Sequence, residues 1–246
     1  LYEGQEGAGL VAIGILNNKK TVDNDEKNYH FKIEIPKMLS FLAERDPDAF
    51  GAGVEDLVKG NEKYGIEPTK EKMRKGKIAI QALKDYKTEK KAGNDEEAYT
   101  HLEKFEEYYD YMGYGYFNDA KETIPNVPLT FYSFHVMVIL GFYFILLFAL
   151  MLWYSYTDRI ANNRFLLKLG LWSIPLGYIA SQLGWVVAEV GRQPWTIQDI
   201  LPTKISTSHI SVSNVQVTFW LFAALFTILL IAEISILVRQ IKIGPK

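Results

Sequence analysis

Three side chains near the end of an apolar stretch have the spacing and the chemistry of a ligand site. Trp185 and Glu189 are four residues apart, and Glu189 and Arg192 are three apart, so all three can share one face of a helix. An intramembrane carboxylate costs free energy and normally faces a partner, a cavity or a cofactor. Arg192 can pair with Glu189 or with an anionic ligand. An ion pair that only fixes the helix end before Pro194 has about equal weight.

Metal chemistry in this chain must use nitrogen, oxygen or thioether ligands. The 246 residues include no cysteine, which excludes disulfides, thiolate zinc sites, iron–sulfur clusters and covalently attached c-type heme. His135 and Met137 lie two residues apart, about 200° around a helix, so they cannot both face one metal ion. Packing is the usual role of a methionine in an apolar helix. His30, His101 and His209 lie in polar regions and are expected to be ordinary surface histidines.

The two halves of the chain differ in character. Residues 1–127 carry 19 Lys and Arg against 25 Asp and Glu, and residues 128–246 carry 8 against 4. Neither half has the dense basic patch that nucleic-acid binding requires, so no nucleic-acid partner is expected. We predict an acidic, water-exposed domain over 1–127 and a membrane domain over 128–246.

The apolar half contains three stretches that are long enough to cross a membrane, at about 129–157, 169–190 and 215–238. A span needs roughly 20 apolar residues, and its backbone must satisfy its own hydrogen bonds, so all three are predicted as helices. Aromatic side chains near their ends suit interfacial belts; they are Tyr132, Trp153, Tyr154, Tyr156 and Trp195. Glu233 lies inside the third span, where a proton path and a helix–helix hydrogen bond are both open interpretations.

Basic residues in the connectors favour one orientation. Most of them lie after the first span and in the C-terminal tail: Arg159, Arg164, Lys168, Arg239, Lys242 and Lys246. Cytoplasmic loops carry an excess of Lys and Arg, which predicts a cytoplasmic C-terminus with residues 1–127 and 191–214 outside. The chain starts at Leu1 without the features of a signal peptide. It is therefore interpreted as a processed product, a fragment or one half of a split subunit.

The first half is predicted to be mainly helical. Residues 10–16 and 29–35 are β-rich and flank a turn-rich segment, which predicts a hairpin with a long loop. A Lys-rich helix is expected over 69–91. Asn94 is predicted to cap the next helix, with Glu97 completing a capping box. The predicted fold is an all-α integral membrane protein, with three C-terminal transmembrane helices preceded by this extracytoplasmic loop domain.

The apolar half and the loop domain also resemble a known family. GRQPW at 191–195 is similar to the signature of the large subunit (subunit I) of cytochrome bd-type quinol oxidases, and the similarity continues nearly throughout 178–203. Looser similarity is found in FYSFHVMV at 131–138, IAEISILV at 231–238, MGYGYF at 112–117 and IEIPKMLSFLA at 33–43. The resemblance therefore extends over almost the whole chain.

This resemblance implies a larger assembly in the cytoplasmic membrane of a bacterial or archaeal cell. The family's large subunit has nine transmembrane helices, a periplasmic quinol-binding loop and three hemes: a low-spin heme b, a high-spin heme b and a heme d. This chain would supply the loop and the last three helices. The implied partners are the remaining N-terminal helices, the small subunit II, single-span accessory subunits, membrane lipid and quinol. The family's lysine and glutamate tied to quinol oxidation have no match here.

Individual positions carry implied roles. Glu189 matches the carboxylate that ligates a high-spin heme iron, and Arg192 matches an arginine placed to meet a heme propionate, which suits its planar fork. Trp185 matches an aromatic beside the hemes that assists electron transfer. Met137 matches the thioether ligand of the low-spin heme b. His135 stands where the family usually has arginine: protonated, it would replace that charge, and neutral, it would weaken the propionate contact. A swap that puts His135 on the iron is the less favoured alternative.

The implied function is oxidation of membrane quinol at the exterior face and reduction of dioxygen to water with protons from the cytoplasm, which generates a proton motive force. A non-catalytic structural or assembly subunit of the same family is the alternative, motivated by His135 and the missing loop residues. A transporter is a third interpretation, for which the in-span Pro175 is weak support.

Overall fold

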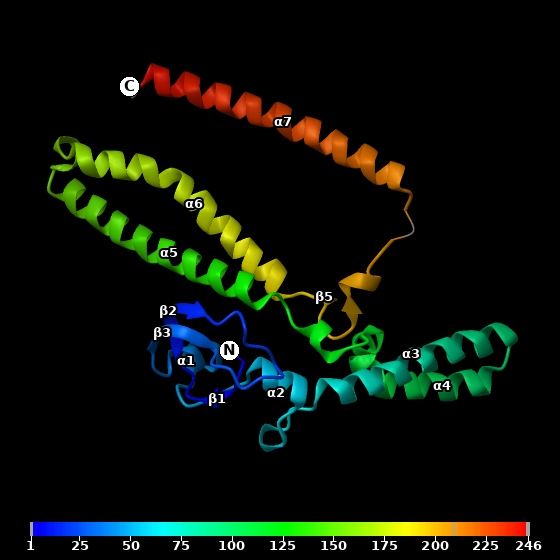
Figure 1. The fold of residues 1–246 in the computed structure, drawn as a ribbon. Coiled ribbons are helices and arrows are strands. Elements are labelled where there is room, and N and C mark those ends of the chain that lie inside the picture. Colours follow the sequence, from blue (N-terminus) through cyan, green and yellow to red (C-terminus); the bar gives the residue numbers. More distant parts are fainter. Residues whose placement is uncertain (1, 209, 245–246) are drawn as a thin grey trace. The chain divides into compact units, whose positions relative to one another are not determined.

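The computed structural model describes residues 2–208 and 210–244. The chain forms two compact units, Leu1–Ser206 and Thr207–Lys246, and each is described by itself (Figure 1). The first unit contains the loop domain and two long helices, and the second contains one long helix. The division at residue 127 that composition predicts stays a prediction.

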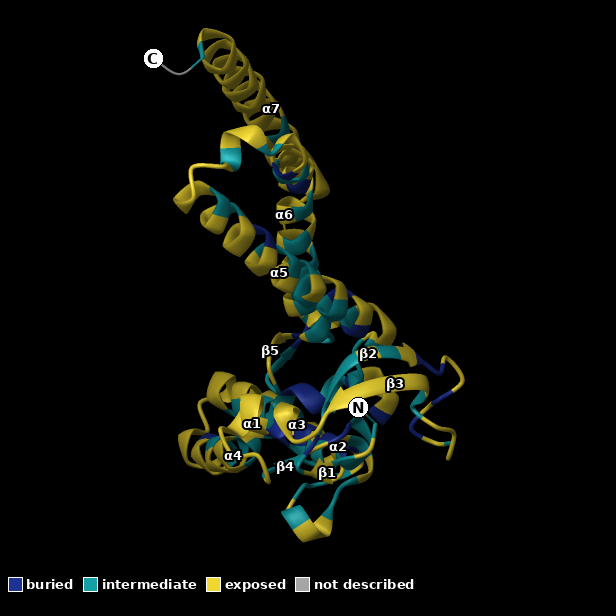
Figure 2. Cartoon of the chain, turned by 90° about the vertical axis from the view of Figure 1, so that its left-hand side faces the viewer, coloured by how far each residue is buried: buried dark blue, intermediate teal, exposed yellow. Residues whose placement is uncertain are grey.

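Three long helices confirm the all-α membrane fold. They are α5 (Val127–Tyr156), α6 (Arg164–Gly191) and α7 (Val212–Ile243), and each is long and apolar enough to cross a membrane. α6 begins five residues earlier than predicted because the Asn163 side chain caps it, accepting a hydrogen bond of 3.1 Å from the Leu166 amide. Within its own unit α7 is exposed almost throughout (Figure 2).

Glycines that recur every seven residues hold α6 close to α5. A Cβ atom added at Gly170, Gly177, Gly184 or Gly191 would lie 3.0, 3.9, 3.1 or 3.4 Å from Met151, Phe144, Met137 or Thr130, respectively. Because the repeat is seven on both helices, this is the packing of an antiparallel, left-handed pair. A hydrogen bond of 2.5 Å between Tyr143 Oη and Ser173 Oγ also joins the two helices. We call these four contacts the glycine ladder.

The loop domain contains the predicted hairpin and helices. Strands β2 (Leu10–Leu16) and β3 (Tyr29–Ile35) pair antiparallel. The Lys-rich segment forms α3 (Thr69–Ala92), which packs against α4 (Asp95–Tyr108) and a 3₁₀ segment, Tyr109–Tyr116. The shorter elements are β1 (Gln5–Glu6), α1 (Met38–Glu44), β4 (Phe50–Gly51), α2 (Val54–Lys59), β5 (Trp195–Ile197), β6 (Leu201–Pro202) and 3₁₀ turns at Glu62–Tyr64, Ala120–Thr123, Ile160–Asn162 and Thr203–Ile205.

The predicted capping box at the start of α4 is wrong. Asn94 precedes the helix, but its side chain makes no capping hydrogen bond. Instead, Nδ2 of the Asn94 side chain donates to Glu89 Oε2 at 2.7 Å. Gly93 ends α3 in the left-handed region, at φ 85°, and the chain turns there so that Asn94 reaches the last turn of α3. The Asn94 side chain therefore hydrogen-bonds to the Glu89 carboxylate and does not cap α4. The capping box that would include Glu97 does not form.

The prediction of an interfacial position for Trp195 is also wrong. Trp195 is only 4% exposed and belongs to the core of the loop domain, with Met73, Tyr114, Phe117 and Ala120. Its ring packs edge-on against Tyr114 and Phe117, with centroids 4.9 and 5.3 Å away. The segment after α6 is thus part of the loop domain's core.

Two side chains of α5 bind the hairpin. The Tyr132 hydroxyl accepts a hydrogen bond of 3.1 Å from the Leu16 amide. His135 Nδ1 lies 2.7 Å from the carbonyl oxygen of Phe131, and its Nε2 lies 2.8 Å from that of Val11. The ring of His135 therefore lies between α5's own backbone and the hairpin.

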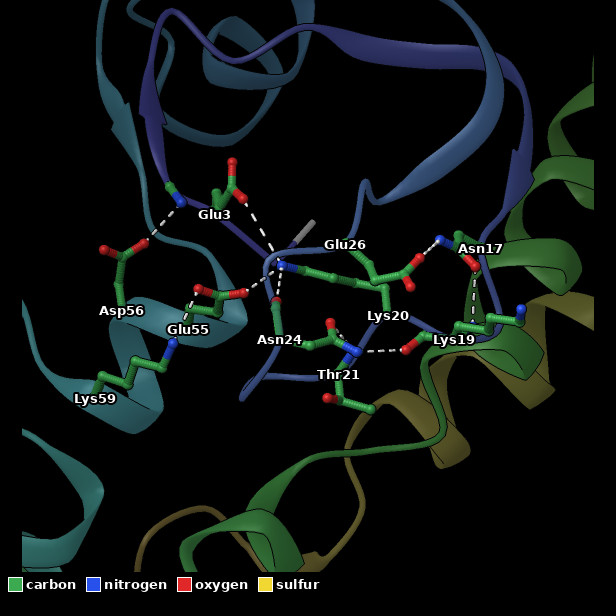
Figure 3. A network of polar contacts seen from close by, with 11 residues as sticks. Glu3, Asn17, Lys19, Lys20, Thr21, Asn24, Glu26, Glu55, Asp56 and Lys59 are labelled. Atoms are coloured by element: carbon green, nitrogen blue, oxygen red, sulfur yellow. Dashed lines mark hydrogen bonds and ion pairs between the residues drawn. The ribbon is translucent and has the colours of Figure 1, made fainter.

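A buried lysine organises the loop that joins the two strands of the hairpin (Figure 3). The Lys20 side chain is 1% exposed, and its ammonium lies 2.8 Å from Glu55 Oε1 and donates to the Asn24 carbonyl at 2.8 Å. The hydrogen bond to Glu55 raises the pKa of Lys20, although burial opposes this. Burial raises the pKa of Glu55, but the contacts with Lys20 and Lys59 outweigh it and leave that pKa lowered. Lys20 therefore fixes the loop to α2.

Replacing His135 should loosen the hairpin. His135→Phe keeps a ring against Phe131 but removes the contact to Val11, and a lost hydrogen bond of this kind costs about 1 kcal/mol. We expect faster amide hydrogen exchange across β2 and β3. His30→Phe, at an exposed position of the same hairpin, should leave the exchange unchanged. Equal hydrogen exchange rates in the two variants would show that His135 does not hold the hairpin on α5.

Replacing Lys20 should destabilise the loop domain. In Lys20→Met the Glu55 carboxylate loses the ammonium group that faces its Oε1 atom. We expect the free energy of unfolding to fall by about 2 kcal/mol, a value between those of exposed and fully buried ion pairs. The contribution of Lys20 is lost as pH rises through its raised pKa, and that of Glu55 as pH falls through its lowered pKa. The loss should therefore be greatest between about pH 4.3 and pH 10.4. Denaturant titration measures it.

Lys19→Met is the matched control, since Lys19 is exposed. It should change the stability by less than about 0.5 kcal/mol. A Lys20→Met protein as stable as the Lys19→Met protein at neutral pH would show that the buried pair has no role.

Candidate functional site

The end of α6 brings together a carboxylate and a guanidinium. Arg192 follows the last helical residue, Gly191, and forms an ion pair with Glu189 one turn earlier. A cation is favourable at this end of a helix, where the backbone carbonyls carry partial negative charge. The side chains of Glu189 and Arg192 are 38% and 49% exposed. The predicted contact between the two residues is therefore present, and both groups remain accessible.

Trp185 lies one turn before Glu189 and is 64% exposed. Within the described part of the chain, the ion pair with Arg192 is the only polar contact recorded for the Glu189 carboxylate. A carboxylate has about four lone-pair sites, so Glu189 retains the capacity to bind a further group. The end of α6 thus exposes one aromatic ring, Trp185, and one ion pair, Glu189–Arg192.

The backbone around these residues is held by the segment that follows. The Gln193 side chain donates to the carbonyl of Glu189 at 3.3 Å and accepts from the Thr203 hydroxyl at 3.0 Å. The carbonyl of Pro194 accepts from the backbone amide of Thr203 at 2.8 Å, and it shares the single hydroxyl proton of Thr203, also at 2.8 Å, with the Gln193 side chain. The end of α6 is therefore braced by residues ten positions further along.

His135 and Met137 face different elements. His135 contacts Val11 of the hairpin, whereas the sulfur of Met137 lies 3.1 Å from the position of a Cβ atom at Gly184 of α6. Met137 is half-buried, in the glycine ladder. Gly184, which Met137 faces, lies five residues before Glu189 on α6.

A largely apolar cavity of about 350 Å³ lies between the hairpin, the start of α5 and Val187 of α6. Its lining residues come from several separate segments: Gly9, Leu10, Val11, Tyr29, Leu39, Val54, Pro125, Val127, Thr130, Phe131, Phe134, His135 and Val187. Burial, and then the charge of Glu34, raise the pKa of the Tyr29 hydroxyl to about 12. Sequence analysis did not find this cavity, because no local pattern joins these segments.

The remaining candidates do not gather around a common point. Residues 2–208 and 210–244 contain no cluster of three or more His, Cys, Asp and Glu side chains suited to a metal ion. His30 is exposed as predicted, but His101 is half-buried; His209 is outside the described residues. Glu233 lies in α7, and its role stays a prediction.

Known proteins similar to this chain carry cytochrome bd oxidase names. The chain is 28% identical over 240 residues to cytochrome bd-II ubiquinol oxidase subunit 1 of Escherichia coli (strain K12), covering 91% of this chain and 44% of that protein. It is 30% identical over 124 residues to cytochrome bd ubiquinol oxidase subunit 1 of Bacillus subtilis (strain 168), covering 50% of this chain and 26% of that protein. The chain thus spans less than half the length of these relatives.

The match to the family as a whole is more extensive. Residues 1–245 match the family described as cytochrome bd terminal oxidase subunit I. The matched range includes the loop domain, the glycine ladder and the Glu189–Arg192 pair. The chain therefore belongs to the cytochrome bd terminal oxidase subunit I family.

Proposed function

We propose that this chain is the heme-bearing part of a membrane complex that oxidises quinol and reduces dioxygen to water. The observation that carries the proposal is the accessible Glu189–Arg192 pair at the end of α6, in a chain that belongs to this family. The loop domain, residues 1–127, lies outside the cytoplasmic membrane, and the C-terminus lies in the cytoplasm. The partners are the remaining helices of the large subunit, the small subunit II and single-span accessory subunits.

The end of α6 is the high-spin site of this proposal. Glu189 ligates a high-spin heme iron, heme b or heme d, and Arg192 neutralises a propionate with its planar guanidinium. Trp185, exposed beside them, offers an aromatic ring against the macrocycle. When bound, the hemes supply the electron transfer and the oxygen chemistry. The residues of this chain bind them, orient them and set the local charge.

Met137 is the low-spin site. Its thioether ligates the iron of the low-spin heme b, and a methionine ligand raises the potential of such a heme. Its place in the glycine ladder supports this role, because Gly184 fixes the helix position of the sulfur. The ladder also limits the rotamers that Met137 can take.

The apolar cavity beside α5 is the proposed site for the quinol ring. Its lining is apolar and aromatic, with Tyr29, Thr130 and His135 as the polar side chains. Both ring nitrogens of His135 already contact carbonyl oxygens, so the ring is held by the protein on both sides. His135 therefore shapes the cavity wall.

Removing the Glu189 carboxylate should abolish the high-spin site. In the complete complex, we expect Glu189→Ala to lose the high-spin heme absorption and to reduce oxygen consumption by at least roughly 100-fold, because metal sites are sensitive even to outer partners. Arg192→Met removes the ion pair but leaves the carboxylate, and should keep the high-spin heme absorption, shifted but present. If Glu189→Ala keeps every heme signal and its oxygen consumption, the proposal is wrong.

Removing the Met137 sulfur should affect only the low-spin heme. Met137→Leu nearly conserves the volume that packs on Gly184, so the fold should change by less than about 1.5 kcal/mol. We expect the low-spin heme b absorption to disappear or to shift to a high-spin form. Met151→Leu makes the same change against Gly170 of the glycine ladder and should leave the spectrum intact. Identical spectra of both variants would exclude Met137 as a ligand.

A further inference from the structure

The segment after α6 is fixed to the loop domain by Asp199. The Tyr114 hydroxyl donates to Asp199 Oδ1 at 2.6 Å, and the Gly113 amide donates to the Asp199 carbonyl at 2.8 Å. Tyr114 also packs edge-on against Trp195. Main-chain and side-chain contacts therefore join the same two segments, which are 85 residues apart.

Gly113 lies so close to Asp199 and Trp195 that no larger residue fits at its position. A Cβ atom on Gly113 would lie 2.4 Å from the Asp199 carbonyl oxygen and 2.6 Å from the Trp195 ring. Asp199 adopts φ 63°, in the left-handed region that aspartate tolerates better than most residues. Burial, together with Asp199, holds the pKa of Tyr114 well above its usual value, so its hydroxyl stays a donor. This junction explains why MGYGYF and GRQPW contain these small and aromatic residues.

A second contact secures the same segment. Lys204 pairs with Glu122 at 2.7 Å, and its ammonium lies 4.6 Å from the centre of the Phe117 ring. In the same segment, the Thr203 hydroxyl hydrogen-bonds to the Gln193 side chain, which in turn hydrogen-bonds to the Glu189 carbonyl. An unbroken set of contacts thus runs from the loop domain to the end of α6.

We propose that Asp199 is a positioning residue, which through Tyr114 and Trp195 lets the loop domain set the orientation of Glu189 and Arg192. The inference rests on the proposed role of those two residues at the high-spin heme. Both side chains are half-exposed, and the contacts through Gln193 and Thr203 fix the backbone that carries them. Asp199 itself touches Tyr114, Gly113 and Gln198, so its effect on a heme is indirect.

The test uses the complete oxidase complex with Tyr114→Phe and Asp199→Ala. Each variant loses the charge-assisted hydrogen bond, and Tyr114→Phe keeps the ring against Trp195. We expect the high-spin heme potential and absorption to shift and oxygen consumption to fall by roughly tenfold, the scale of one such bond. The low-spin heme absorption should stay unchanged. Asp199→Asn keeps an acceptor and tolerates the same backbone conformation, and should restore most of the activity.

Tyr111→Phe, the same change three residues away in the same 3₁₀ segment, is the control and should behave as the unmodified complex. The inference is overturned if Tyr114→Phe leaves the high-spin potential, spectrum and rate unchanged. It is also overturned if all hemes and the yield of complex fall together, since that is a general loss of fold. Failure of the proposed function is distinguishable, because the unmodified complex would then show no high-spin heme.

Discussion

The contact between α5 and α6 determines where the functional groups of this chain can lie. Four glycines of α6 remove the side chains that would keep the helices apart, and α5 presents a larger residue opposite each of them. In a membrane, where apolar burial contributes little to helix association, such close packing is a main source of stability. The glycine ladder places the Met137 sulfur against α6 and brings the start of α5 and the end of α6 to the loop domain.

The loop domain is bound to this helix pair by polar contacts and one buried aromatic ring. His135 and Tyr132 hold the hairpin on α5, and Trp195 enters the core of α3 and the 3₁₀ segment. Lys20 fixes the long hairpin loop at a buried ion pair. Buried ion pairs contribute modestly to stability, but an unpaired member is costly, so the loop has few alternative positions. The loop domain is therefore held to the helix pair at several separate points.

Local patterns allowed much of this fold to be predicted, and long-range contacts account for what was missed. Apolar runs and β-rich segments predicted the three membrane helices and the hairpin, because periodicity within one segment carries that information. The Glu189–Arg192 pair was also predictable, since its members are one helical turn apart. Trp195 was misplaced because an aromatic residue near a helix end fits an interfacial belt, while its partners, such as Met73, are distant in the chain. The glycine repeat is visible in the sequence, but the residues of α5 that lie opposite it are not.

The limits of prediction at the site have the same cause. The partner of His135 is Val11, 124 residues away, and no motif indicates it. The heme-binding roles of Glu189, Arg192, Trp185 and Met137 follow from family resemblance and stay predictions. What the structure adds is their surroundings: an accessible ion pair, an exposed ring and a sulfur in a tight helix contact.

The seven-residue spacing of the glycines also restricts how the gene for this chain can change. One residue inserted between Gly177 and Gly184 would rotate everything beyond it by about 100° around the helix. The last two glycines would then turn away from Met137 and Thr130, and Glu189 would turn with them. Insertions and deletions are therefore not tolerable within this stretch of α6, where evolution is confined to substitution.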